Sequence, residues 1–130
     1  MKDVVALGEL LIDFAPVSTD GEGYPTLKAQ PGGAPGNFLA ALQAYGCTTA
    51  LIGKVGDDAF GHLLVGTLKS LGIGTEGIVT DPSVFTTLAF VTLDSTGNRS
   101  FSFARKPGAD TCLRTDEVPY ALLEDCKVFH

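Results

Sequence analysis

The chain has 130 residues, of which 45% are hydrophobic and 18% are charged. This balance is typical of one globular domain and excludes an intrinsically disordered chain. The formal net charge of −6 argues against a nucleic-acid partner, because an acidic surface repels a phosphate backbone.

Neither membrane targeting nor metal binding is indicated by the sequence. No apolar run approaches the roughly 20 residues of a membrane-spanning helix, and the N-terminal stretch lacks the basic leader of a signal peptide. Cys47, Cys112 and Cys126 are far apart and form no C-x-x-C pair or Cys/His cluster. Separate, reduced thiols are typical of the cytosol. We therefore expect a cytoplasmic protein with no membrane partner and no metal site in this chain.

The first part of the chain alternates predicted strands with predicted helices. Short apolar or extended runs predict strands at residues 3–8, 10–15, 27–30, 49–55 and 77–80. Apolar residues at helical spacing predict helices at 37–45 and 59–71, the second capped by Asp57 or Asp58. A turn-rich loop spans 19–25. Strands and helices joined by short connections predict an α/β fold with a parallel sheet.

The second part of the chain follows a different pattern. Two extended runs at 86–94 and 99–104, joined by Ser-Thr-Gly-Asn, predict a hairpin and hence a small separate sheet. The segment 116–124 is expected to be helical, and residues 127–130 begin another apolar strand. A core strand that starts where the sequence stops would leave an incomplete sheet edge. The simplest interpretation is a piece of a longer protein.

A glycine-rich run, Gly32-Gly33-Ala34-Pro35-Gly36-Asn37, is the most informative motif. We expect residues 32–36 to lie outside regular helix and the following helix to offer unpaired N–H donors. The Lys-Ser/Thr of a Walker loop is missing, and the first strand is not followed by a Rossmann G-x-G-x-x-G. The amide of Asn37 suits polyol hydroxyls. The alternative is a tight strand-to-helix turn.

Several motifs together carry a family resemblance. The runs are Gly8-Glu-Leu-Leu-Ile-Asp-Phe, Pro31 to Asn37, Ile52-Gly-Lys-Val-Gly-Asp-Asp-Ala-Phe-Gly61, Thr86 to Val91 and Phe103-Ala-Arg-Lys-Pro-Gly-Ala-Asp110. In this order they resemble the N-terminal half of ribokinase-like (PfkB-type) sugar kinases, closest to the fructokinase branch, and they cover essentially the whole chain. The resemblance implies a three-layer α/β domain, incomplete here, with a β-sheet lid from strands near 10–30 and 86–104.

The resemblance also implies an activity for the full-length protein. Such kinases transfer the γ-phosphoryl group of ATP to a sugar hydroxyl with a divalent cation, usually Mg²⁺, mainly by positioning and charge stabilisation. The family's G-A-G-D motif, which carries the catalytic base, is absent, as are the ATP-binding segments. Gly108-Ala109-Asp110 resembles that motif but follows a lid strand. We therefore expect no catalytic residue in this chain and no turnover by the chain alone.

Roles in sugar binding follow from the resemblance. They concern Asp13, Gly32, Gly33, Asn37, Phe90, Phe103 and Arg105. Asp13 would accept hydrogen bonds from sugar hydroxyls, although it could be a solvated acid at a strand end. Phe90 and Phe103 would cover the sugar, or would be core residues of the lid. Arg105 would point into the substrate pocket, or would form a surface ion pair.

Some motif residues are interpreted structurally, and some questions stay open. Lys54, Asp57 and Asp58 are expected to support the fold, and Asp110 to orient the loop after Arg105. The alternatives to a fructokinase are a 2-keto-3-deoxygluconate, ribose or nucleoside kinase of the same family, or a sugar-binding or dimerisation module without catalysis. A homodimer through the lid is a further expectation, because exposed lid strands can pair between subunits.

Overall fold

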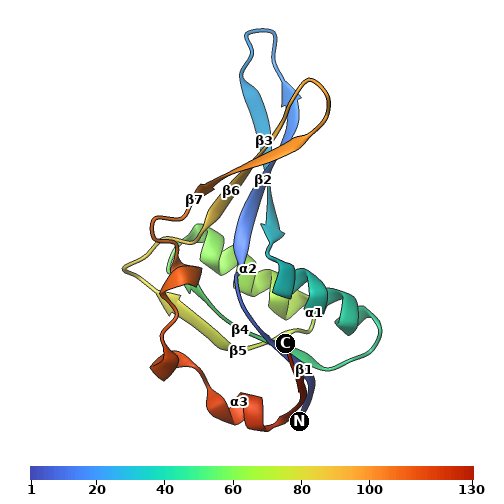
Figure 1. The fold of residues 1–130 in the computed structure, drawn as a ribbon, viewed down its shortest axis with the longest axis vertical. Coiled ribbons are helices and arrows are strands. Elements are labelled where there is room, and N and C mark those ends of the chain that lie inside the picture. The colour runs from blue at the N-terminus through green and yellow to red at the C-terminus, as the bar shows by residue number, and fades with distance from the viewer.

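The computed structural model describes residues 1–130 and contains two four-stranded sheets. The first sheet is entirely parallel, with the order β5-β4-β1-β8. Its strands are β1 (Lys2–Leu7), β4 (Thr49–Gly56), β5 (Gly74–Asp81) and β8 (Cys126–Phe129). Helices α1 (Ala34–Ala44) and α2 (Ala59–Ser70) cover one face, and α3 (Tyr120–Glu124) lies on the other (Figure 1).

The core explains this three-layer arrangement. Every residue of β4 is buried, as expected for a central strand covered on both faces. Leu51 and Val55 of β4 pack with Leu39 of α1 and Leu64 of α2. The alternate residues of β1 and β4 pack with Leu113, Val118, Leu122, Leu123 and Cys126 on the α3 side. The expected α/β class is confirmed.

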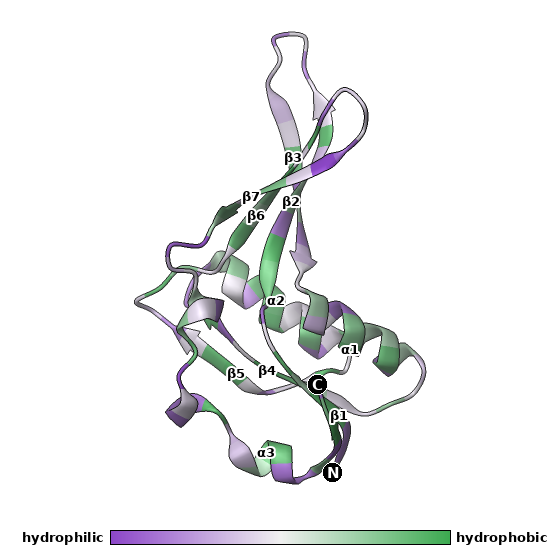
Figure 2. Cartoon of the chain, viewed as in Figure 1, coloured by the Kyte–Doolittle hydropathy of each residue, from purple (hydrophilic) through white to green (hydrophobic).

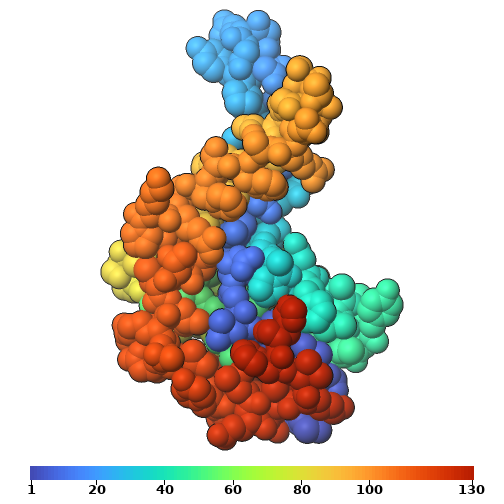
Figure 3. All heavy atoms as spheres, viewed as in Figure 1, coloured from blue at the N-terminus to red at the C-terminus, as the bar shows by residue number.

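The second sheet, which we call the arm sheet, projects from this body (Figures 1 and 3). Its order is β3-β2-β6-β7, from β2 (Leu11–Thr19), β3 (Pro25–Gly32), β6 (Leu88–Leu93) and β7 (Arg99–Ala104). β2 pairs antiparallel with β3 and parallel with β6, and β6 pairs antiparallel with β7. Two hairpins far apart in the sequence thus form one sheet.

Strand register defines two faces of the arm sheet. Asp13 lies opposite Gln30 and Ala89, and Ala89 lies opposite Phe103. Because side chains alternate along a strand, these residues share one face, which we call the Asp13 face. Phe14, Ala29 and Phe90 occupy the other face, which packs on the body near Phe60. Figure 2 shows apolar residues along the lower arm strands and more polar ones in the outer loops.

The helix boundaries differ from expectation at two places. The first helix begins at Ala34, so Ala34 to Gly36 form its first turn. The prediction of a non-helical run through residue 36 was wrong, because proline suits the first turn of a helix, where its missing N–H costs nothing. The expected helix at 116–124 is divided into a 3-10 turn, Thr115–Glu117, and α3, with Pro119 between them.

None of the helices is both long enough and apolar enough to cross a membrane. The remaining short element is a 3-10 turn, η1 (Ala109–Cys112), which follows the arm sheet and packs beside β4.

Candidate functional site

The carboxylate of Asp13 lies directly against the backbone of Gly32. Gly32 ends β3 and pairs with Leu11, two residues along the ladder from the Asp13–Gln30 pair. A Cβ atom on Gly32 would overlap the Asp13 carboxylate and would lie 3.0 Å from a methyl group of Leu11. Only glycine therefore lets β2 present Asp13 at the start of the glycine-rich turn.

Gly33 makes the turn into α1 possible for a different reason. Its φ is +111°, in the region that favours glycine, and a Cβ would lie 2.5 Å from the carbonyl oxygen of Glu9. The Glu9 side chain accepts a hydrogen bond from the Ala34 N–H at 3.3 Å. Pro35 has no N–H to offer. Two residues of the first turn thus cannot bind an anion, which argues against a phosphate cradle.

Glu9 was missed by sequence reasoning. It lies in the Gly8-Glu-Leu-Leu run, but nothing local shows that its carboxylate reaches residue 34, 25 positions away. Through this hydrogen bond, the chain after β1 holds the start of α1, where the glycine-rich turn ends.

Asn37 lies on the exposed side of the first turn of α1. Its backbone N–H donates to the Gly33 carbonyl at 3.2 Å, the first hydrogen bond of the helix. Its side chain is exposed and makes no hydrogen bond within the chain. An unpaired amide offers both donors and an acceptor, which is the pattern a polyol hydroxyl can use.

Partial burial raises the pKa of Asp13 above its ordinary value, because desolvation disfavours the charged form. A groove of about 310 Å³ on the arm brings Asp13 together with Gln30, Arg99 and Phe101. Gln30 was not among the expected site residues, and its place opposite Asp13 is a product of strand register.

The two candidate phenylalanines lie on opposite faces of the arm sheet. Phe103 is on the Asp13 face, 50% exposed, and stacks on Phe101 with ring centroids 6.2 Å apart. Phe90 is on the other face and stacks on Phe14 at 5.2 Å, and Phe14 meets Phe60 of α2 edge-on at 5.6 Å. The structure brings Phe103, but not Phe90, to the side of Asp13.

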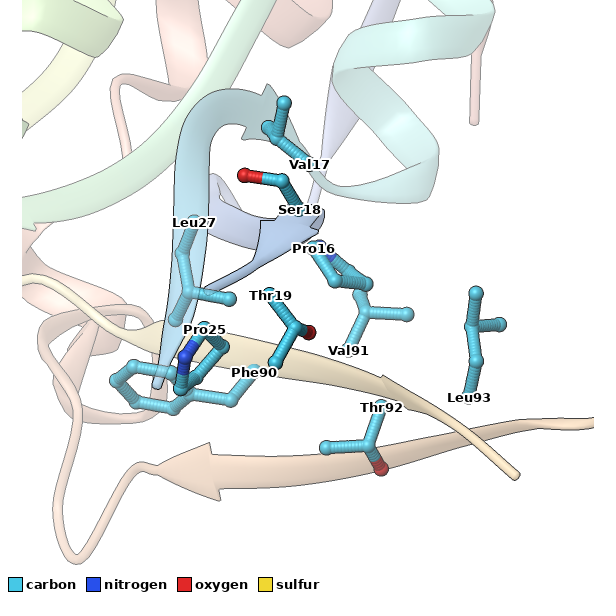
Figure 4. Close-up of a pocket in the computed structure, with 10 residues that line it drawn as sticks. All are labelled: Pro16, Val17, Ser18, Thr19, Pro25, Leu27, Phe90, Val91, Thr92 and Leu93. Carbon is cyan, nitrogen blue, oxygen red and sulfur yellow. The ribbon is translucent and has the colours of Figure 1, made fainter. Parts of the chain in front are cut away.

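Phe90 also lines the larger groove, of about 520 Å³, on the outer half of the arm (Figure 4). Its other walls include Val17, Leu27 and Leu93, which are exposed apolar residues. Asp13 is not among the lining residues. This groove adjoins the Asp13 groove, with which it shares Pro16, Val91 and Leu93.

Arg105 follows β7 and pairs with the buried carboxylate of Asp110. Its guanidinium Nε donates to Oδ1 at 3.3 Å, and its Nη2 donates to Oδ2. Thr87 donates its hydroxyl to the same Oδ1 at 2.5 Å. Asp110 thus holds the loop after Arg105, and the guanidinium is committed to a partner within the chain.

Lys54 and Asp58 have structural partners. Lys54 is 2% exposed, and its Nζ lies 2.9 Å from Asp81 and 2.8 Å from Glu117. Asp58 caps α2 by accepting from the N–H groups of Phe60 and Gly61. Asp57 does not cap the helix, and instead its carboxylate lies 2.8 Å from Nε2 of His62.

No three His, Cys, Asp or Glu side chains are grouped so as to hold a metal ion. The oxygen ligands that Mg²⁺ prefers are therefore not assembled by these residues. These side chains therefore do not assemble a site that fits Mg²⁺. In the first turn of α1, Ala34 and Pro35 likewise offer no free donor to a nucleotide phosphate.

Comparison with known proteins places this geometry in a family. The model of the pfkB family of carbohydrate kinases matches residues 1–130. The chain belongs to this family. Among curated pfkB-type relatives, a probable fructokinase-4 from Arabidopsis thaliana is 47% identical over 132 residues, covering 98% of the chain and 40% of the relative.

Solved structures of family members agree with the fold. A fructokinase from Xylella fastidiosa superimposes with a TM-score of 0.89 at 36% identity, covering 100% of this chain and 41% of that one. A structure of fructokinase from the same organism with bound ATP gives 0.89 at 35% identity, covering 100% of this chain and 39% of that one. The chain therefore spans about two-fifths of the length of the relatives it matches.

Proposed function

We propose that the whole protein containing this chain is a fructokinase, which phosphorylates fructose with ATP. The observation that carries the proposal is the contact between Gly32 and Asp13, which holds a partly desolvated carboxylate against the glycine-rich turn that leads to Asn37. Asp13 accepts hydrogen bonds from sugar hydroxyls, and Asn37 donates and accepts them. Gly33 lets the backbone approach the sugar, and the similarity to plant and bacterial fructokinases supports fructose as the substrate.

In this proposal the chain supplies the sugar side of the site. Phe103 covers the sugar from the Asp13 face of the arm sheet, which acts as a lid, and Arg105 lies at the edge of the same face. The proposal assigns ATP, its Mg²⁺ and the catalytic base to the rest of the whole protein. The chain alone then binds sugar without turning it over.

The proposed protein is cytoplasmic and forms a homodimer through the arm sheet. Supporting the dimer, the arm exposes large apolar side chains, including Val17, Leu93, Phe101 and Phe103. Exposed apolar patches of this kind mark interaction surfaces, and the edge strands β3 and β7 leave backbone groups unpaired.

The test is a comparison of substrates with the full-length protein encoded by the gene. Turnover of fructose, ribose, adenosine and 2-keto-3-deoxygluconate should show the highest kcat/KM for fructose. A preference for one of the others would identify another kinase of the family. The absence of any turnover, in a gene with no G-A-G-D motif downstream, would instead establish a binding or dimerisation module.

A further inference from the structure

Asp110 is a fixed and fully buried carboxylate beside a more exposed arginine. The Asp110 side chain has 0% exposure, whereas that of Arg105 has 34%. Thr87 holds one oxygen of Asp110 at 2.5 Å, and the Ala109 N–H donates to the Phe85 carbonyl at 2.9 Å. A Cβ on Gly108 would overlap the Thr87 hydroxyl, so the backbone here is packed against the pair.

Both partners belong to the Asp13 face of the arm sheet. Thr87 precedes Ala89 by two residues, and Arg105 follows Phe103 by two, at the ends of the β6–β7 ladder. Because side chains alternate along strands, both lie on the side of Asp13. Arg105 lies two strands from β2 and two residues beyond the row of Asp13, or about 12 Å at ordinary strand geometry, which its long side chain brings within reach of a shared ligand.

The charge of Arg105 is balanced within the chain. Its guanidinium pairs with Asp110, while Arg99 lies in the groove with Asp13. The guanidinium donates to both oxygens of Asp110, the fork geometry that an arginine would otherwise offer to a carboxylate of the substrate. A sugar acid that took up this two-donor contact would have to displace Asp110 and leave a buried carboxylate without its charged partner, which is strongly unfavourable.

We infer that Asp110 is a positioning residue that restricts this site to uncharged sugars, by holding Arg105 in an internal ion pair. This inference rests on the proposed function and deepens it, because it names the class of substrate that the sugar site accepts. A neutral sugar can still accept a hydrogen bond from the exposed part of the guanidinium, since that contact leaves the ion pair intact.

The decisive variant is Asp110→Asn in the full-length protein, with Thr87→Val as the matched control. Asn keeps the shape of the side chain and removes the charge that neutralises Arg105, whereas Thr87→Val removes one hydrogen bond to Asp110 and leaves the charges unchanged. The readout is the ratio of kcat/KM for fructose to kcat/KM for 2-keto-3-deoxygluconate. We expect Asp110→Asn to shift this ratio towards the acid at least tenfold, and Thr87→Val to shift it less than twofold.

An unchanged ratio in a folded Asp110→Asn protein would overturn the inference, and so would equal turnover of both substrates by the natural protein. Direct binding keeps the inference testable if the variant does not fold or if no sugar is phosphorylated. Sorbitol and gluconate differ at one end, where a hydroxymethyl group replaces a carboxylate. Calorimetry on the natural protein should show sorbitol binding at least tenfold more tightly, and equal or tighter binding of gluconate would refute the role of Asp110.

The two proposals fail in different ways. If the natural protein phosphorylates no sugar, the proposed function is wrong, while the sorbitol and gluconate affinities still decide the charge selection. If fructose is phosphorylated but Asp110→Asn leaves the ratio unchanged, the proposed function stands and only the role of Asp110 is lost.

Discussion

Gly32 and Asp13 occupy adjoining strands so closely that a single added methyl group at residue 32 would overlap the carboxylate. The glycine and the acid therefore form one unit, in which the bare backbone of β3 sets the position of the carboxylate on β2. This contact accounts for the first glycine of the motif, and the positive φ of Gly33 accounts for the second.

Replacing Gly32 with alanine should impair sugar binding by moving Asp13. Loss of a hydrogen bond to a charged group costs about 1.5–3 kcal/mol, which is about 10- to 100-fold in affinity. Fructose affinity, measured by calorimetry on the full-length protein, checks this. Gly66→Ala is the control, because a Cβ at Gly66 meets nothing within 4 Å, and that variant should gain about 0.5–1 kcal/mol of stability with sugar affinity unchanged.

The pH dependence of sugar binding should report the raised pKa of Asp13. The ionised carboxylate accepts hydroxyl hydrogen bonds, so binding is strong above this pKa and is lost as the pH falls through it. Because burial raises the pKa, the loss should begin at a higher pH than for an ordinary aspartate. Fructose affinity measured between about pH 4 and pH 7 gives the midpoint of this loss, which should lie above the ordinary aspartate pKa of about 4.

Asp13→Asn provides the matched variant. It should bind fructose weakly at every pH and lack the acid transition. The folded state favours the protonated form of Asp13. The ionised carboxylate therefore lowers the free energy of unfolding of the natural protein when the pH is above the raised pKa, and this loss disappears as the pH falls. The variant should therefore be at least as stable as the natural protein at neutral pH. A clear loss of stability there would contradict this interpretation.

Alanine substitutions of Phe90 and Phe103 should have different effects, one on stability and the other on sugar binding. Phe103 is half exposed on the Asp13 face and stacks only on Phe101, so Phe103→Ala should cost at most about 1 kcal/mol of unfolding free energy while raising the KM for fructose. Phe90 packs on Phe14, so Phe90→Ala should cost about 1–3 kcal/mol of stability through lost burial and stacking. Denaturant unfolding measures the effect on stability, and KM and kcat measure the effect on binding. A raised KM for Phe90→Ala with a loss of stability for Phe103→Ala would place Phe90 at the sugar.

Lys54 should be a stability residue. Its ammonium joins β5 to the segment after η1 through Asp81 and Glu117, and the hydrogen bond from Lys54 holds the pKa of Glu117 below its ordinary value. A carboxyl group with a lowered pKa stabilises the fold when the pH is above the ordinary pKa of that group. This contribution is lost as the pH falls through the lowered pKa. Lys54→Met should therefore lower the melting temperature by several degrees at neutral pH.

The same variant should also lose part of its acid sensitivity, since fewer paired carboxylates remain to be protonated. Thermal melts at neutral and acid pH measure both effects. Lys2→Met is the control, because the Lys2–Glu76 pair is partly exposed and such surface pairs contribute little. Equal effects of the two substitutions would show that burial of Lys54 does not matter.

Local patterns in the sequence were sufficient for most of the fold. The strands of the parallel sheet, the hairpin of residues 88–104 and the cap at Asp58 depend on residues within a few positions of one another. The start of α1 was misjudged because glycines suggested a loop, whereas Pro35 is well suited to the first turn of a helix.

The sequence by itself determined the α/β class, which follows from periodicity, and its contiguous motifs carried the resemblance to sugar kinases. Only the tertiary structure decided which side chains share a face or a partner. Phe90 and Phe103 were separated by strand register, Glu9 reached residue 34, and Arg105 was neutralised by Asp110 against Thr87. These choices depend on how distant segments pack, which no local pattern encodes.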